Sequence, residues 1–215
     1  MIEFLQGIDE QMLLAVNGTW GQWADMFWYT FSGRWVWIPL YCALMVMLMQ
    51  RYGWRNALGF LLVVVCIIAV SDQTCATVIR PAVERLRPAN PDNPLSQSIY
   101  IVNNYRGGSY GFPSCHATNT VALAVFFIWL TRSKILGTVL VLWAAMNCYS
   151  RMYLGVHYPG DLIVGALIGA AYASLAYGAL RWYVNMPDVR GESFVRFPAW
   201  VFALTTAAIA LYAYL

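Results

Sequence analysis

Long apolar runs separated by short polar connections dominate the hydrophobic pattern of the chain. A helix that spans a membrane needs about 20 mostly apolar residues. Six segments approach that length, at residues 35–50, 57–79, 114–131, 134–150, 161–182 and 198–215. The pattern therefore predicts an all-α fold, a polytopic membrane helix bundle with about six transmembrane helices. We expect residues 1–215 to form a single integral-membrane domain.

The N-terminal segment, residues 1–33, has a different pattern. Over residues 2–16 the apolar side chains recur at helical spacing and polar or acidic ones occupy the other face, which predicts an amphipathic helix. Asn17-Gly18 would end this helix, and the aromatic cluster that follows suits the level of the lipid headgroups. We expect the whole segment to be interfacial, lying on the membrane rather than crossing it.

Composition agrees with a membrane protein. Hydrophobic residues make up 60% of the chain and charged residues only 11%, whereas soluble domains carry about 25% charged residues. A chain this short cannot hide that much apolar surface from water, so a water-soluble globule, a coiled coil and a disordered chain are excluded. The net charge of +3 is too small and too dispersed to indicate a nucleic-acid partner.

Basic residues give an expected orientation. Their count on alternate connections is nearly even, but several arginines on one side belong to the clusters described next, and residues 1–33 contain acids without any Lys or Arg. The positive-inside rule then places the connections at 51–56, 132–134 and 181–197 in the cytoplasm. Both termini and the long polar segment 80–113 would face outward.

Three polar clusters fall on that outward side, at the ends of predicted spans. They contribute three arginines, the two histidines of the chain and one carboxylate: Arg80, Arg87, Arg151, His116, His157 and Asp161. Each also has a purely structural interpretation, since arginines at span ends reach headgroups, Ser114 could simply cap a helix, and a His and an Asp four residues apart could stabilise a helix start. Their convergence on one membrane face favours a shared chemical role.

Phosphoryl transfer is the chemistry that such a set suits. Guanidinium groups bind the oxygens of a multiply charged tetrahedral anion, and helix N-termini add backbone N–H donors. A histidine oriented by a carboxylate can act as a nucleophile, and a second histidine can give a proton to the leaving oxygen. The residues therefore predict a phosphohistidine intermediate with no metal or other cofactor. Zinc is an alternative for two histidines and one aspartate, but three nearby arginines would repel a dication.

The same residues resemble the signature of the type 2 phosphatidic acid phosphatase (PAP2) superfamily, which reads K-x6-RP, then PSGH, then SR-x5-H-x3-D. This chain has Arg80-x6-Arg87-Pro88, then Pro113-Ser114-Cys115-His116, then Ser150-Arg151-x5-His157-x3-Asp161. The catalytic motif region would thus cover residues 80–161. The resemblance also implies a six-helix core with the site on one membrane face.

The resemblance implies a role at each matched position. It makes His157 the nucleophile, Asp161 the carboxylate that orients it, and His116 the general acid that protonates the departing lipid oxygen. The implied phosphate-binding set is Arg80, Arg87, Ser114, Cys115 and Arg151. The resemblance also implies a metal-independent acid phosphatase or diphosphatase, with a lipid phosphate and the membrane lipids as partners and no obligatory protein partner.

Two positions depart from the family pattern, and one further residue needs an account. Arg80 stands where Lys is usual, which keeps the charge. Cys115 stands where Gly is usual; its N–H could still bind phosphate, but a positive φ would be unfavourable, and a nucleophilic Cys115 is an alternative. Asp72 lies deep in the second predicted span, where it could brace Arg80, form the polar base of the site, or make a hydrogen bond between spans.

The substrate prediction follows from the outward, membrane-level position of the clusters. Undecaprenyl diphosphate is our first choice, and the alternatives are phosphatidylglycerophosphate, phosphatidate and lipid A. Segment 89–112 could form a lid, with Arg106 holding a second phosphate and Tyr110 near the headgroup. The short chain without soluble insertions predicts a bacterial inner membrane with the site facing the periplasm.

Two other classes of protein could use similar residues. An anion transporter would need charges through several spans and an internal repeat, and the arginines here gather at one face instead. A haloperoxidase with related motifs would be soluble, which this composition excludes.

Overall fold

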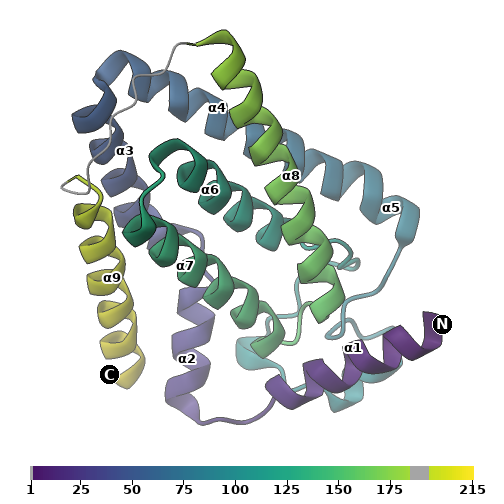
Figure 1. The fold of residues 1–215 in the computed structure, drawn as a ribbon. Helices are drawn as coiled ribbons and strands as arrows, with labels where there is room; N and C mark the ends of the chain where they lie inside the picture. The colour runs from purple at the N-terminus through teal and green to yellow at the C-terminus, as the bar shows by residue number, and fades with distance from the viewer. Residues whose placement is uncertain (1, 185–193) are drawn as a thin grey trace.

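A computed structural model describes residues 2–184 and 194–215 as an assembly of helices (Figure 1). The helices are α1 (Ile2–Val16), α2 (Gln22–Phe31), α3 (Ile38–Tyr52), α4 (Trp54–Gln73), α5 (Arg80–Val83), α6 (Cys115–Thr131), α7 (Lys134–Tyr153), α8 (Pro159–Tyr183) and α9 (Arg196–Tyr214). A wider π-helical turn, Thr74–Ile79, joins α4 to α5, and 3-10 turns occupy Trp35–Trp37, Pro94–Ser98 and Val102–Asn104. The all-α prediction is confirmed, because these described residues contain no named strand.

Each of the six predicted apolar segments forms a helix. Within residues 2–184 and 194–215, four helical runs are long and apolar enough to cross a membrane: Trp54–Val83, α7, α8 and α9. Helix α2 and residues 35–52 meet the same test only as a pair, bent by 71°, and α6 is shorter at 17 residues. Composition and length therefore support four or five spans, and the number six stays a prediction.

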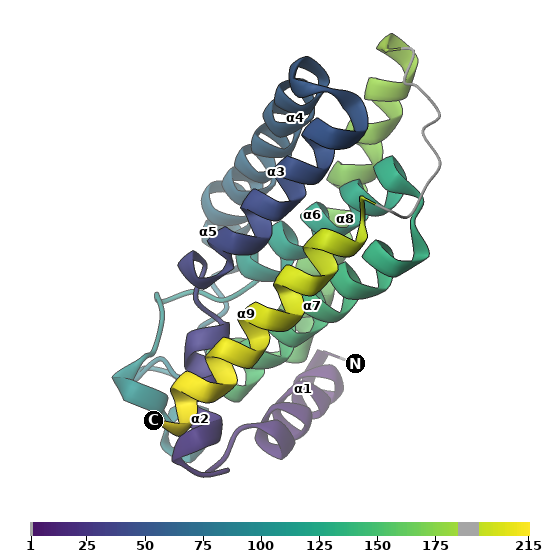
Figure 2. The ribbon, with the colours of Figure 1, turned by 90° about the vertical axis from the view of Figure 1, so that its left-hand side faces the viewer.

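Helix α6 lies among the other helices rather than on their outside (Figures 1 and 2). It is apolar around most of its circumference, which is typical of a buried helix. Gly165 and Gly169 of α8 allow the closest approach to it. A Cβ at Gly165 would lie 2.5 Å from the Ser114 carbonyl oxygen, and one at Gly169 would overlap the carbonyl of Thr118. Small residues four apart let two backbones meet, and they bring the start of α6 beside the start of α8.

The N-terminal segment forms two helices, α1 and α2. Helix α1 ends at Val16, as Asn17-Gly18 predicted, and it turns Phe4 and Met12 outward, 70% and 52% exposed. The aromatic cluster that follows forms a second helix, α2, which the sequence analysis did not predict. Helix α2 packs against α9, where the Trp23 indole donates to the Ala210 carbonyl at 3.0 Å.

The connections alternate between two ends of the bundle. The α3–α4 and α6–α7 turns lie at one end, while α1, the C-terminus and the long connection from α5 to α6 lie at the other (Figures 1 and 2). The predicted orientation requires connections at alternate ends of this kind. Which end faces the periplasm stays a prediction.

Candidate active site

His157 lies in the connection between α7 and α8 and is almost completely buried. Its Nδ1 is 3.2 Å from Oδ2 of Asp161, and its Nε2 is 2.8 Å from Nη1 of Arg87. A carboxylate only accepts hydrogen bonds and a guanidinium only donates them. The proton of the neutral ring therefore sits on Nδ1, and Nε2 carries the lone pair.

Asp161 is fully buried in the first turn of α8, so its charge needs partners. Oδ2 accepts the backbone N–H of Tyr158 at 3.1 Å in addition to His157. Oδ1 forms an ion pair with Arg85 Nη1 at 3.0 Å. Arg85 was not among the predicted site residues; its position between Arg80 and Arg87 in the first cluster was the available signal.

Arg87 is fixed by backbone groups on two sides of the site. Its Nε donates to the Tyr110 carbonyl and its Nη1 to the Val156 carbonyl, both at 3.1 Å. The chain around it pairs with the end of the same long connection, because the Arg87 N–H donates to the Ser109 carbonyl at 3.0 Å. This short pairing holds the guanidinium against His157.

Like charges are concentrated here, and their effect is visible in the pKa values. Burial, followed by the charges of Arg80 and Arg151, lowers the pKa of Arg87 to about 10. Burial, followed by Arg87 and the other two arginines, holds the pKa of His157 well below its ordinary value. Both effects favour the neutral form of the His157 ring, in which Nε2 carries a lone pair.

Arg80 and Arg151 hold the other two predicted guanidinium positions. Arg80 donates from Nε and Nη2 to the Pro113 carbonyl at 3.3 and 3.2 Å. Arg151 donates to the Ser32 hydroxyl at 2.5 Å and to the Tyr105 hydroxyl at 2.9 Å. Its Nε is buried and has no hydrogen-bond partner within the described part of the chain. A phosphate oxygen would satisfy that donor.

His116, in the first turn of α6, is held by a neutral amide. Its Nε2 is 3.0 Å from Oδ1 of Asn147, whose Nδ2 in turn donates to the Trp143 carbonyl at 2.9 Å. That second bond fixes the amide orientation, so His116 donates from Nε2 and keeps Nδ1 for proton exchange. Asn147 was not predicted. A polar residue inside an apolar span, one helical turn before Arg151, was the signal that could have found it.

Ser114 and Cys115 form the start of α6. The Ser114 hydroxyl accepts the Ala117 N–H at 3.4 Å, which is the helix-capping role that the sequence left open. Ser114 also donates its own N–H to the Asp161 carbonyl at 3.0 Å and so ties the second motif to the third. Cys115 is the first residue of α6 and does not have a positive φ. The conformation that would demand glycine is therefore not needed here.

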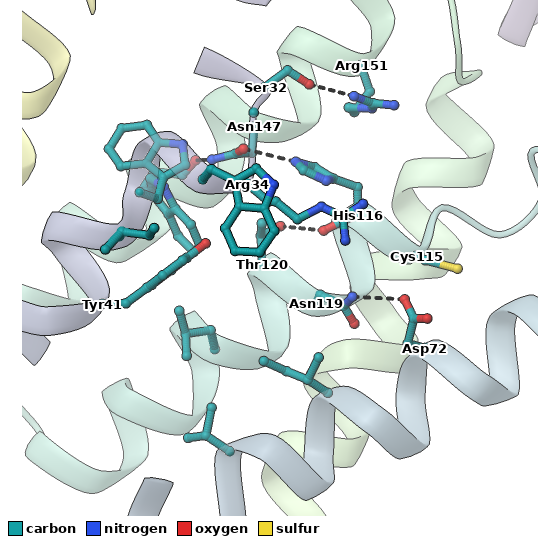
Figure 3. A pocket seen from close by; sticks show the side chains of 18 of the residues that line it. Ser32, Arg34, Tyr41, Asp72, Cys115, His116, Asn119, Thr120, Asn147 and Arg151 are labelled. Carbon is teal, nitrogen blue, oxygen red and sulfur yellow. Dashed lines mark hydrogen bonds between the residues drawn. The ribbon is translucent and has the colours of Figure 1, made fainter. Parts of the chain in front are cut away.

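A cavity of about 1110 Å³ joins these groups to the apolar interior. Its polar wall contains most of the predicted site: Arg80, Arg87, Cys115, His116, Arg151 and His157. Its apolar wall comes from α3, α4 and α6, including Leu44, Leu48, Leu61, Val65, Ile68 and Phe127. Figure 3 shows His116, Arg151 and Arg34 around the polar part. Arg34, just after α2, was not among the predicted site residues.

The two residues predicted for a lid, Arg106 and Tyr110, do not line the cavity. Arg106 donates from Nη1 to the Ala89 carbonyl at 2.7 Å. From the same segment it is Tyr105 that reaches the cavity, through its hydrogen bond with Arg151. A role for Arg106 or Tyr110 in a lid stays a prediction.

Asp72 lines the cavity below the polar wall, where Asn119 donates to its Oδ1 at 3.0 Å (Figure 3). This is the hydrogen bond between spans that was one of three predicted alternatives, since α4 carries Asp72 and α6 carries Asn119. The described residues contain no group of three or more His, Cys, Asp or Glu side chains that could hold a metal ion.

Comparison with known proteins places this site among related sequences. The family model of the PAP2 superfamily matches residues 56–185. The lipid A 4'-phosphatase of Bacteroides thetaiotaomicron is 46% identical over 82% of this chain and 79% of its own length. The undecaprenyl-diphosphatase of Sulfolobus acidocaldarius is 28% identical over 79% of this chain and 73% of its own length.

One solved structure has a similar fold. It is the crystal structure of the transmembrane PAP2-type phosphatidylglycerolphosphate phosphatase from Bacillus subtilis, with a TM-score of 0.58 and 21% sequence identity. The similarity covers 85% of this chain and 89% of that one. At this level of identity it supports the helical membrane fold.

Proposed function

This chain belongs to the PAP2 superfamily and is a membrane lipid phosphatase, and from that premise we propose that it hydrolyses the 4'-phosphate of lipid A. The substantial identity to a lipid A 4'-phosphatase along most of both chains supports this substrate over undecaprenyl diphosphate, the first choice from sequence. Undecaprenyl diphosphate is kept as the second candidate because a less similar relative carries that name.

The cavity is the observation that carries the proposal. It is lined both by guanidinium and imidazole groups and by apolar side chains of α3, α4 and α6. A lipid phosphate has the matching shape, with a charged group to be bound by fork-like donors and an apolar part to be buried. A small water-soluble phosphate ester would leave the apolar wall without a partner.

His157 is the proposed nucleophile. Its Nε2 lone pair attacks phosphorus, a nitrogen–phosphorus bond forms, and the bond from phosphorus to the lipid oxygen breaks. Asp161 accepts the hydrogen bond from Nδ1–H throughout, while the proton stays on the ring, and it stabilises the positive charge that develops there. Arg87 donates to Nε2 at 2.8 Å, and in this scheme that donor moves to a phosphate oxygen when substrate binds.

His116 is the proposed general acid. Because Nε2–H is committed to Asn147, a protonated His116 gives its Nδ1 proton to the departing lipid oxygen. Water then attacks phosphorus and its proton passes to the same Nδ1. Cleavage of the nitrogen–phosphorus bond restores the His157 lone pair and releases inorganic phosphate. The buried Arg151 Nε, together with Arg80 and Arg87, would bind the transferred group.

The proposed setting is a bacterial inner membrane with the cavity at the periplasmic side. The support is the alternation of connections in the fold and the distribution of basic residues in the sequence. Cysteine variants at exposed positions of α1 and of the α3–α4 turn would be tested in intact cells with a membrane-impermeant thiol reagent. Labelling from outside is expected only at α1; labelling at the α3–α4 turn alone would reverse the orientation.

The function is tested by phosphate release from purified protein in lipid nanodiscs. Lipid A, undecaprenyl diphosphate, phosphatidate and phosphatidylglycerophosphate would be compared, each with and without EDTA. We expect the highest kcat/KM for lipid A, unaffected by EDTA, and inhibition by vanadate, which mimics the five-coordinate transition state. A clear preference for undecaprenyl diphosphate would replace the proposed substrate, and loss of activity in EDTA would contradict the metal-free reaction.

A further inference from the structure

The N-terminal helix reaches the candidate active site through a single carboxylate. Asp9 of α1 forms an ion pair with Arg85, from Oδ2 to Nη2 at 2.8 Å. The other end of the same guanidinium, Nη1, pairs with Oδ1 of Asp161 at 3.0 Å. Arg85 therefore bridges a carboxylate of the interfacial helix and the carboxylate that contacts His157.

The approach of Asp9 is built into the start of α8. Its Oδ1 accepts the N–H of Gly160 at 2.8 Å, so Asp9 occupies one of the free backbone donors in the first turn of α8. A Cβ at position 160 would lie 2.7 Å from Oδ2 of Asp9. Only glycine leaves room for this contact without displacing the carboxylate.

The surroundings keep the bridge in place. The Asp9 and Arg85 side chains are only 16% and 22% exposed, and Asp161 is fully buried. The Arg85 guanidinium also lies over the ring of Tyr158, 4.0 Å from its centre. Charge pairs with little access to water are screened less than surface pairs and fix geometry more strongly.

Asp161 depends on this arrangement for its orientation. One of its oxygens serves His157 and the Tyr158 N–H, while Arg85 is the charged partner of the other. If Arg85 swings away, the carboxylate can rotate and the buried charge loses its counter-ion. Asp9 limits that movement by holding the second half of the guanidinium.

We propose that Asp9 and Arg85 are positioning residues for the nucleophile, and that α1 is thereby part of the active site rather than only a membrane-surface helix. Asp9 orients Arg85, Arg85 orients Asp161, and Asp161 fixes the proton of His157 on Nδ1. The inference rests on the proposed phosphohistidine mechanism. It adds Asp9, which lies outside the three family motifs, and Arg85, which occupies an unspecified position within the first of them.

The test compares Asp9→Asn with Glu10→Gln, a matched loss of one charge at the next position of α1. Both would be made in the full chain and assayed in nanodiscs with ³²P-labelled lipid A. The reaction would be stopped rapidly without acid, so that the phosphoenzyme is preserved and can be measured. We expect Asp9→Asn to slow phosphoenzyme formation and kcat by about 10- to 100-fold, the range for small misplacement of a reacting group. KM should stay within about twofold, and Glu10→Gln should behave as the wild type.

Two further variants test whether Asp9 positions the nucleophile or only holds α1 against the other helices. Gly160→Ala, which displaces Asp9 without removing a charge, should reduce kcat in the same way. Arg85→Gln should have the larger effect, and adding Asp9→Asn to it should cost almost nothing more, because both act through one path. Normal phosphoenzyme formation in Asp9→Asn, with only a lower thermal midpoint, would overturn the proposal. If the wild type itself forms no phosphoenzyme, it is the proposed mechanism that fails.

Discussion

The two histidines of the site are held by opposite kinds of surroundings. His157 lies between a carboxylate and a guanidinium, each in contact with one of its ring nitrogens. His116 has one described side-chain hydrogen bond at its ring, to the neutral amide of Asn147, and it lies on the wall of the cavity. Identical side chains are thus prepared for different tasks by their neighbours.

The difference matches what each ring has to do in the proposed reaction. A nucleophile must keep one proton and one lone pair at fixed atoms, and a charged partner on each side achieves that. A general acid must gain and lose a proton in each cycle, so a strong charge partner would hold it in one state. A neutral amide orients His116 and leaves its proton free to move.

The largest expected effects come from replacing each histidine and comparing two substrates whose leaving groups differ in their need for a proton. His157→Ala should lower kcat by at least about 1000-fold with any substrate, because no covalent intermediate can form. His116→Ala should slow phosphoenzyme formation by about 100-fold or more with lipid A, but far less with p-nitrophenyl phosphate, whose departing oxygen needs no proton. The rate at which the leaving group is released in the first turnover, measured for both variants on both substrates, gives the comparison, because later turnovers also need His116 to take the proton of water.

The control for this experiment is the wild type on p-nitrophenyl phosphate, which must show measurable turnover. Equal losses for the two variants on both substrates would contradict the division of roles. Retained turnover in His157→Ala would remove His157 as the nucleophile.

A smaller loss is expected when the amide partner of His116 is changed. Asn147→Leu removes the acceptor for Nε2–H, so kcat should fall by about 10- to 100-fold, part of the range for general acid catalysis. Asn147→Asp keeps an acceptor and adds a negative charge, which stabilises protonated His116. That variant should retain most activity, with its optimum displaced to higher pH, and a pH–rate profile of the three proteins checks the difference. Identical profiles would show that Asn147 does not orient His116.

Sequence patterns predicted the helices well because their cause is local. Apolar runs of span length became α3, α4 and α6 to α9, and Asn17-Gly18 ended α1. The three motifs meet in space because α6 and α8 start at the same end and pack through Gly165 and Gly169. For the site itself, spacing located His157 and Asp161 four residues apart, which places them together in a helix start.

What the sequence did not predict depends on contacts between distant segments. Asp9 and Arg85 are 76 residues apart, and Asn147 lies 31 residues from His116. No local periodicity relates such pairs. Helix α2 was missed for a related reason: its aromatic side chains suit an interface in the sequence, while their burial against α9 and α7 exists only in the fold.

The buried, neutral state of His157 predicts a dependence of stability on pH. Its folded-state pKa lies well below the ordinary value, which is about 6.5 in an unfolded chain. Below that pH the unfolded state binds the extra proton, so this residue lowers stability as pH falls, by up to about 1.4 kcal/mol per pH unit. Thermal midpoints in detergent between pH 7.5 and 5 should decline less steeply in His157→Asn than in the wild type. Parallel curves would show that His157 titrates normally in the folded protein.

The smallest effect is expected at Cys115, where the chain departs from the glycine of the family signature. The residue has ordinary helical backbone at the start of α6, so its N–H is presented as a glycine N–H would be. Cys115→Gly should therefore change kcat/KM by no more than about threefold, since only a modest helix propensity difference of roughly 1 kcal/mol is involved. Treatment of the wild type with a thiol-specific reagent should slow turnover by blocking the cavity, and Cys115→Gly should resist it. Loss of the phosphoenzyme in Cys115→Gly, with His157 intact, would instead assign the covalent step to the thiol. His157 would then not be the nucleophile, and the division of roles between the two histidines would be wrong.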